Sequence, residues 1–314
     1  MCIRDRISGA ITKGRAGKEL CDMGELKKEG VAVVTDDGSS VAGVELMAEA
    51  FRRAKKEKMP VICHSEDKKL SGKGVVNLGF TSTRLGLKGV SNESEYKAVE
   101  RDIRLAEEAK AAVHIAHVSC RESVDIIRKA KKKGIRVTAE TAPHYFILND
   151  EMLLDYNTNM KINPPLRSKE DVEAIKQGLQ DGTIDVIASD HAPHTENEKE
   201  IEFEHAESGT IGLETELSLG ITGLVLAGSL TWSDLVRKMC FNPSKILGIN
   251  KGTLGIGSEA DIVIVSRDTE WYVKKENFIS KSRNSAFIGM KLKGMVDYTI
   301  CGGRIIYGSK EASK

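Results

Sequence analysis

The clearest indication of the fold is the segment Asp185-Val186-Ile187-Ala188-Ser189-Asp190-His191-Ala192-Pro193-His194. A short apolar run ends there in one carboxylate and two imidazoles. An α/β barrel keeps its catalytic groups at the carboxyl ends of its parallel strands. The stretch therefore predicts a strand that delivers catalytic or metal-binding side chains to the rim of such a barrel.

Two earlier apolar runs end in the same way, at Cys63-His64-Ser65-Glu66-Asp67 and at His114-Ile115-Ala116-His117. Parallel strands that end at a common rim bring together side chains that lie far apart in sequence. Imidazole nitrogen and carboxylate oxygen are the ligands that zinc and similar ions prefer. The rim would offer Asp36 or Asp37, His64, His117, His144, Asp190, His191 and His194. We therefore expect a shared metal site, with room for two ions that clamp one substrate oxygen.

Short β-branched runs alternate with longer helical patterns from about residue 30. The expected strands are 31–35, 60–63, 113–117, 136–140 and 185–188, and the expected helices are 41–57, 95–112, 121–134 and 169–180. This alternation is typical of βα units and a parallel sheet. It gives about five units where a complete barrel has eight. The long connection over 65–94 is typical of a functional loop.

The end of the chain has a different pattern. Helices are expected at 213–227 and 232–246, followed by glycines and by strands at 260–265, 295–301 and 304–307. We therefore expect a partial (β/α)8 metal-dependent hydrolase barrel over 7–248 and a small C-terminal β domain over 249–314. Residues 1–6 fit neither a targeting peptide nor a helix start, and we interpret them as a sequence artefact.

Composition excludes several classes of partner. The chain has 314 residues and nearly balanced charge, 47 basic against 46 acidic, which argues against a nucleic-acid groove or a membrane-surface patch. No apolar segment approaches the roughly 20 residues that span a bilayer. The six cysteines form no CxxC pair and no secretory signal precedes them, so we expect a reducing cytoplasm.

Three histidines have simpler interpretations. His114 lies three residues before His117 and so has the opposite strand parity, which predicts a structural side chain that points toward the helix layer. His205 lies in a charged segment and is expected to be exposed. His191 follows Asp190 with opposite parity and is expected to be structural or to support a ligand.

Eight motifs in order resemble bacterial dihydroorotase, a cyclic amidohydrolase family. They are Gly9-Ala10-Ile11-Thr12-Lys13-Gly14, Thr35-Asp36-Asp37-Gly38, Val61-Ile62-Cys63-His64-Ser65-Glu66-Asp67, His114-Ile115-Ala116-His117-Val118-Ser119, Thr141-Ala142-Pro143-His144, Lys161-Ile162-Asn163-Pro164-Pro165-Leu166-Arg167, Ser189-Asp190-His191-Ala192-Pro193-His194 and Ile211-Gly212-Leu213-Glu214-Thr215. The similarity runs from about residue 8 to 308. It implies the reversible hydrolysis of dihydroorotate to N-carbamoyl-aspartate in pyrimidine synthesis.

The resemblance also implies roles for individual residues. Two zinc ions are expected in a complete site, with a bridging acidic ligand at Asp37, or alternatively at Asp36, and the second-metal histidines at His64 and His117. Asp190 matches the carboxylate that both ligates the first metal and moves the proton. Substrate contacts carry over to Asn163, His194 and the backbone of Ser208 and Gly209.

The sequence departs from the family pattern in two places. Ser208 stands where the family usually has an aromatic residue. The family's first-strand His-x-His-x-Arg motif, which supplies two first-metal ligands and the arginine that binds the substrate carboxylate, is absent from the sequence. We therefore expect a fragment without the N-terminal third of the barrel, and we expect this chain to be inactive, with unpaired sheet edges.

Two alternatives stay open. Hydantoinase, dihydropyrimidinase and allantoinase share the chemistry, but they place a carboxylated lysine where this chain has Thr35-Asp36-Asp37. A non-catalytic scaffold subunit is the other alternative, although Asp37, His64, His117 and Asp190 are all retained. The expected ligand is a small molecule, and the resemblance implies a homodimer or association with aspartate carbamoyltransferase.

Overall fold

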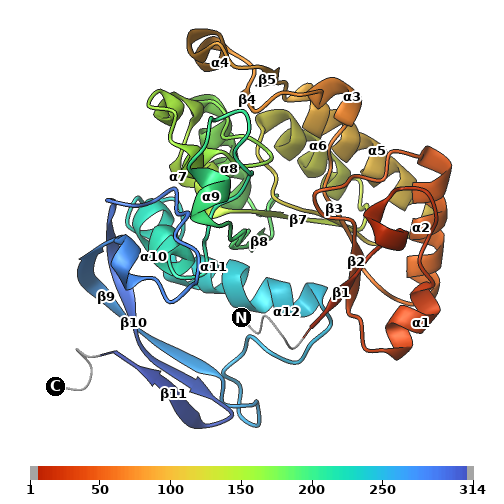
Figure 1. Cartoon of the computed structure of the whole chain (residues 1–314). Coiled ribbons are helices and arrows are strands. Elements are labelled where there is room, and N and C mark those ends of the chain that lie inside the picture. The colour runs from red at the N-terminus through yellow and green to blue at the C-terminus, as the bar shows by residue number, and fades with distance from the viewer. Residues whose placement is uncertain (1–5, 310–314) are drawn as a thin grey trace.

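A six-stranded parallel sheet forms the centre of the molecule (Figure 1). The structure is a computed structural model that describes residues 6–309, so the expectation for residues 1–5 lies outside the described part. The strands follow one another in spatial order: β1 (Ser8–Gly9), β2 (Val33–Thr35), β3 (Val61–Cys63), β6 (Val113–Ile115), β7 (Val137–Thr141) and β8 (Val186–Ile187). All five strands expected in this region are present, and β1 is an addition.

Amphipathic helices connect these strands. They are α1 (Met23–Lys28), α2 (Val44–Lys56), α5 (Glu93–Ala109), α6 (Arg121–Lys132) and α8 (Lys169–Gln180), close to the expected bounds for the last four. In α2 the residues Met47, Ala50, Phe51 and Ala54 are buried, which is the spacing of one helical face. Since each helix returns the chain to the same end of the sheet, every strand delivers its carboxyl end to one rim.

The two faces of the sheet differ in chemistry. Val61, Val113 and Ile115 are buried in the main apolar core together with residues of α2, α5 and α6. The residues that alternate with them point to the opposite face. His114 is one of these: its ring contacts Thr138 Oγ1 at 2.8 Å and Glu140 Oε2 at 3.0 Å.

The expected direction of the His114 side chain is therefore wrong. His114 does not point toward the helix layer but to the polar face of the sheet. Strand alternation does not relate the directions of His114 and His117. The strand β6 ends at Ile115, and His117 has a backbone φ of 36°, so the alternation does not extend that far.

The connection over 65–94 carries secondary structure of its own. It contains α3 (Lys68–Ser71), β4 (Val76–Asn77), α4 (Phe80–Leu85) and β5 (Gly89–Val90). The strands β4 and β5 form a separate two-stranded parallel sheet. Val76 and Leu85 belong to a second apolar cluster that includes Tyr145 and Phe287. The segment is thus a folded flap that packs over the carboxyl ends of the central strands.

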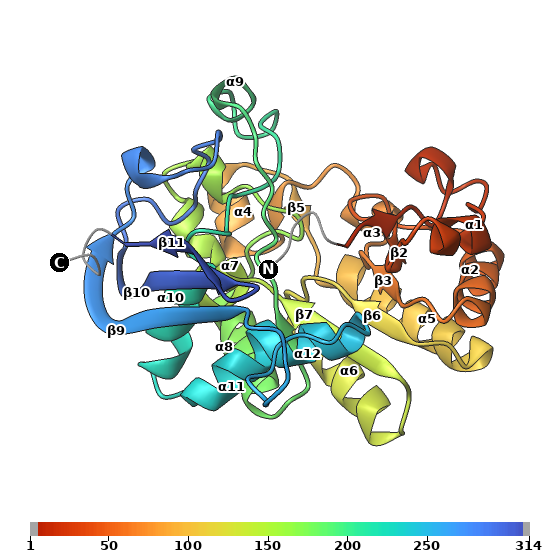
Figure 2. The same ribbon diagram turned by 90° about the horizontal axis from the view of Figure 1, so that it is seen from below.

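A three-stranded antiparallel sheet follows the last helices, on the side of the molecule away from α1 and α2 (Figure 2). These last helices are α9 (Glu196–Lys199), α10 (Glu216–Gly220), α11 (Trp232–Val236) and α12 (Asn242–Ile246), and the strands are β9 (Ile262–Tyr272), β10 (Lys291–Cys301) and β11 (Arg304–Gly308). A further short helix, α7 (Pro143–Ile147), follows β7. The expected C-terminal β structure is confirmed, with β9 and β10 longer than expected. Ser218 Oγ of α10 donates to Gly294 O of β10 at 2.6 Å, so the small sheet packs on the helical part.

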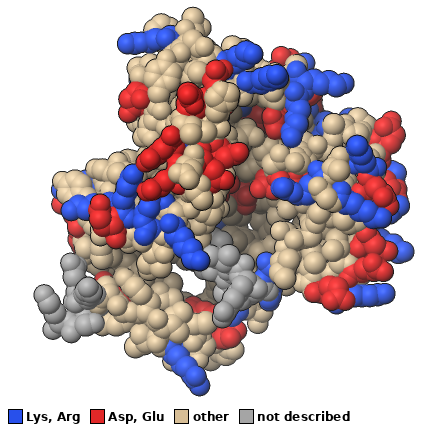
Figure 3. Space-filling view, viewed as in Figure 1, with Lys and Arg blue, Asp and Glu red and all other residues tan. Residues whose placement is uncertain are grey.

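The face of the molecule in Figure 3 carries charged side chains of both signs, and acidic side chains gather near its centre. Among the described residues, no helix has the length and apolar character needed to cross a membrane.

The buried carboxylate of Asp36 fastens the N-terminal segment to the end of β2. Asp36 is 2% exposed and accepts hydrogen bonds from Ile11 N at 2.8 Å, from Thr12 N at 3.1 Å and from the Thr12 hydroxyl.

We expect Asp36→Asn to lower the free energy of unfolding by about 1–3 kcal/mol, because a neutral amide is a weaker acceptor and its NH2 faces donors. Denaturant unfolding measures this change. Unchanged stability in this variant would contradict the structural role.

Candidate metal centre and active site

Three side chains from neighbouring strands converge at the rim. Asp37 follows β2, His64 follows β3, and His117 follows β6 by two residues. His64 Nδ1 lies 2.8 Å from His117 Nε2, and Asp37 Oδ1 lies 3.3 Å from each of these nitrogens. The three residues form a group that could hold a metal ion. The structure thereby distinguishes the two neighbouring aspartates, because Asp36 is buried among backbone donors and Asp37 faces the histidines.

The charges of this group depend on one another. Hydrogen bonds with His117 and His64 hold the pKa of the Asp37 carboxyl well below its usual range. Burial of the His117 ring lowers its pKa, but the hydrogen bond with Asp37 and the nearby carboxylates of Asp190 and Glu140 outweigh burial and raise it to about 9. Without a metal the group therefore holds a proton between the ring and the carboxylate.

Glu66 orients the His64 ring, a role that the sequence motifs did not assign. Its Oε2 lies 3.2 Å from His64 Nε2, and its Oε1 accepts from Ser71 Oγ at 2.6 Å. A proton on Nε2 directed at Glu66 leaves the Nδ1 lone pair free for a metal. Burial raises the pKa of Glu66, but the bonds from His64 and Ser71 outweigh it and lower the pKa to about 2.

Asp190 and His144 meet on the other side of the same rim. His144 Nε2 lies 3.4 Å from Asp190 Oδ2, and the His144 ring is almost fully buried. Burial raises the pKa of Asp190, but His144 and the charge of His117 outweigh burial and lower it. Asp190 is therefore a carboxylate that faces the group of Asp37, His64 and His117, without belonging to its tight cluster of ligand atoms.

Two of these residues have an unusual backbone. His117 has φ 36° and Asp190 has φ 46°, in the left-handed region that non-glycine residues rarely adopt. Such conformations cost of order 1–3 kcal/mol and tend to cluster at functional sites. Here each unusual φ follows the end of a strand and directs the side chain toward the cavity at the rim.

A cavity of about 520 Å³ opens over the rim. The predicted site residues that line it are Asp37, His64, His117, Asn163, Asp190, Ser208 and Gly209. His194 stands behind this wall, where its Nε2 donates to Ser208 O at 3.0 Å. The flap contributes Gly72, Gly74, Val75 and Val90 from the opposite side. The structure thus gathers seven of the eight predicted site residues around one cavity and places His194 behind them.

The wall at Gly209 needs glycine and is held by a buried lysine. Gly209 has φ 149°, and a Cβ there would lie 2.6 Å from the Cβ of Ala192 and 2.9 Å from His194 Nε2. Lys199 Nζ donates to Glu207 O at 2.6 Å and to Gly209 O at 3.1 Å. Burial, reinforced by the nearby charge of Lys161, lowers the pKa of Lys199 to about 8. Lys199 lies in a charged stretch with no motif that could have marked it.

The remaining two histidines agree with the sequence interpretation. His205 is exposed. His191 Nδ1 accepts from Gly212 N at 3.1 Å, and the His191 backbone forms an isolated bridge with Thr210, so His191 supports the segment that follows the cavity wall.

Known proteins resemble this chain over almost its whole length. The amidohydrolase family profile matches residues 4–306. The dihydroorotase of Acetivibrio thermocellus is 52% identical over 302 residues, 96% of this chain and 71% of that protein. The dihydroorotase of Elusimicrobium minutum is 52% identical over 299 residues, 95% of this chain and 69% of that protein.

Solved structures show the same fold. The L-hydantoinase (dihydropyrimidinase) from Arthrobacter aurescens superposes with a TM-score of 0.84 at 26% identity, over 96% of this chain and 70% of that chain. A D-hydantoinase crystal structure gives a TM-score of 0.82 at 23% identity, over 97% and 70% of the two chains. The family profile covers almost the whole chain, and half of the aligned residues are identical to those of curated dihydroorotases. The chain therefore belongs to the amidohydrolase family, among the bacterial dihydroorotases.

Proposed function

We propose that this site serves the reversible hydrolysis of dihydroorotate to N-carbamoyl-aspartate. The observation that carries the proposal is one cavity in which Asp37, His64 and His117 face Asp190 and Asn163. The identity of 52% to proteins named dihydroorotase supports this substrate over the hydantoinase alternative. So does the residue at the bridging position, which is Asp37 and not a lysine.

Asp37, His64 and His117 would hold a metal ion, and zinc suits them. Ligand atoms that surround zinc tetrahedrally at about 2.1 Å lie roughly 3.4 Å apart. The three ligand atoms here are 2.8–3.3 Å apart. His117 Nδ1 is buried without a hydrogen-bond partner in the described structure, and Nε2 is the ring nitrogen that faces the other two ligands. When bound, such an ion polarises a substrate oxygen and lowers the pKa of water.

The remaining residues bind substrate and move a proton. Asp190 faces the group as a carboxylate, so it would accept a proton from the attacking water and return it to the ring nitrogen that leaves. Asn163 would orient the substrate through its amide, and His194 would act through the Ser208 carbonyl that it holds. A homodimer and an association with aspartate carbamoyltransferase stay predictions.

Metal binding tests the ligand group directly. Loss of a residue that only hydrogen-bonds to a metal ligand weakens metal binding by roughly 10–100-fold. We expect Asp37→Asn to weaken zinc binding by more than this, because Asp37 would be a ligand itself. Calorimetric titration of the metal-free chain measures this, with Asp36→Asn as the matched control because that neighbour makes only structural hydrogen bonds. Equal zinc affinity in Asp37→Asn and the unaltered chain would remove Asp37 from the site.

The binding of zinc should depend on pH. The pKa of His117 is about 9 in the folded, metal-free chain and about 6.5 when unfolded, so the protonated ring stabilises this fold below pH 6.5, and that contribution is lost as pH rises through 9. Zinc must displace the same proton. We expect zinc affinity to rise about tenfold per pH unit between pH 7 and 9, with release of one proton measured by calorimetry in buffers of different ionisation enthalpy. A flat profile would mean that the His117 ring is already neutral.

A ligand panel tests the substrate. Dihydroorotate, hydantoin, dihydrouracil and allantoin are titrated into the zinc-loaded chain, and we expect dihydroorotate to bind most tightly. Asn163→Ala should weaken that binding by roughly tenfold, since it removes about one hydrogen bond's worth of free energy. Preference for hydantoin or allantoin would overturn the proposal in favour of the alternative. Measurable hydrolysis of dihydroorotate would instead contradict only the expectation that this chain is inactive.

A further inference from the structure

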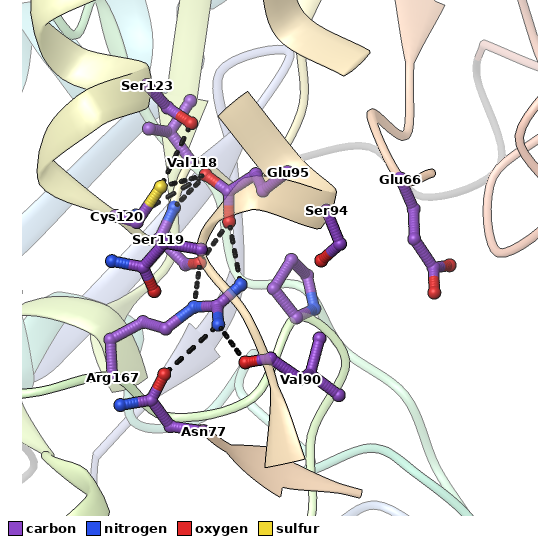
Figure 4. A network of polar contacts seen from close by, with 12 residues as sticks. Glu66, Asn77, Val90, Ser94, Glu95, Val118, Ser119, Cys120, Ser123 and Arg167 are labelled. Carbon is purple, nitrogen blue, oxygen red and sulfur yellow. Dashed lines mark hydrogen bonds and ion pairs between the residues drawn. The ribbon is translucent and has the colours of Figure 1, made fainter. Parts of the chain in front are cut away.

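Arg167 is a fully buried arginine at the centre of the polar network in Figure 4. Its Nη1 donates to Asn77 Oδ1 at 3.2 Å and to Val90 O at 3.0 Å. Its Nε donates to Ser119 Oγ at 3.0 Å, and its Nη2 lies 3.4 Å from Glu95 Oε2. The planar guanidinium therefore uses its fixed donor directions on four different segments.

Glu95 completes the network from α5. It is 4% exposed, and its Oε1 accepts from Ser119 N at 3.0 Å and from Cys120 N at 3.3 Å. The Ser119 hydroxyl donates to the other oxygen, Oε2. A buried charge is tolerated only when it is paired and hydrogen-bonded. The pair is satisfied on both sides, so its geometry is closely defined.

Three of the segments that this network joins contribute residues to the cavity wall: the flap, the segment of His117 and the segment of Asn163. Asn77 and Val90 belong to the flap, in β4 and β5, and Val90 itself lines the cavity. Ser119 follows the proposed metal ligand His117 by two residues. Arg167 follows the proposed substrate contact Asn163 by four residues. One side chain therefore links the flap, the metal side and the substrate side.

Over residues 76–90, which hold β4 and β5, the flap has two other polar contacts with the rest of the described structure. A two-stranded sheet is marginally stable alone. The Tyr156 hydroxyl donates to Leu85 O, at the end of α4 in the flap, at 2.7 Å. The Asp150 carboxylate accepts from Asn77 Nδ2 of β4 at 2.7 Å. On the cavity side, the guanidinium of Arg167 bonds both strands.

We propose that Arg167 is a positioning residue, which holds the flap against the Asn163 wall and so shapes the cavity for its ligand. The part of this proposal that concerns ligand affinity rests on the proposed function. The part that concerns the flap stands on the hydrogen bonds alone.

Two variants test it. Arg167→Lys keeps the charge but cannot reach all four acceptors. Asn77→Ala leaves the Arg167–Glu95 pair intact and removes two flap contacts, those with Arg167 and Asp150. Asp150→Ala removes only the second of these, so a larger effect of Asn77→Ala reports the contact with Arg167. Lys169→Met is the matched control, because Lys169 lies two residues away in an exposed ion pair with Glu151.

The first readout is native-state trypsin cleavage of the flap at the exposed residues Lys73, Arg84 and Lys88. Cleavage there requires the flap to open, so its rate reports local stability. We expect at least tenfold faster cleavage at these sites in Arg167→Lys and about threefold in Asn77→Ala, with no change in Lys169→Met. Mass spectrometry of the fragments identifies the sites.

The second readout separates positioning from a general loss of structure. We expect dihydroorotate affinity to fall about tenfold in Arg167→Lys and about threefold in Asn77→Ala, while zinc affinity in Asn77→Ala stays within twofold. Equal losses of zinc and dihydroorotate affinity, or flap cleavage at the control rate in both variants, would overturn the proposal. If Arg167→Lys does not fold, Asn77→Ala decides. If the unaltered chain binds no dihydroorotate, the proposed function fails, and the cleavage rates still decide the role of Arg167.

Discussion

The parallel register of β2, β3 and β6 is the constraint on which the site depends. Val34 pairs with Val61, and Val61 pairs with Val113, so the three strands end at nearly the same level. Each strand is then followed by one proposed metal ligand: Asp37, His64 or His117. Neighbouring strands lie about 4.8 Å apart, so side chains at the same level of adjacent strands are close enough to contact one metal ion. The apolar core behind the sheet fixes this register, because a slip of one residue would exchange the two faces.

Converging polar groups carry a cost that the surrounding structure offsets. Asp37 and Asp190 face the same cavity, and their like charges oppose one another. The protonated ring of His117 lies between these charges and favours the ionised form of both carboxylates. A metal ion would replace that proton with a larger positive charge. The metal-free site is therefore already arranged for a cation, and its carboxylates keep their negative charge over the physiological pH range.

Sequence patterns predicted the parallel sheet and most of the rim, because apolar periodicity and strand-end histidines are local signals. They failed where tertiary structure overrides local rules. His114 alternates with the core residues Val113 and Ile115 and so points to the polar face. Its parity with His117 does not hold because β6 ends at Ile115, and no local signal places that end. Glu66 and Lys199 act through contacts made only after folding. Arg167 is visible in a motif, but its partners Asn77 and Glu95 lie 90 and 72 residues away along the chain.

The Arg167 network shows why the flap belongs to the site. A catalytic rim on a rigid sheet fixes the metal side of a cavity, but the substrate side comes from loops whose positions the sheet does not determine. A buried guanidinium suits this purpose, because its donors have fixed directions and leaving any of them unpaired is costly. The flap, the segment after His117 and the segment after Asn163 can therefore satisfy Arg167 and Glu95 together only in one relative arrangement. The position of the flap and the positions of the two neighbouring cavity walls are in this way linked through one buried charge pair.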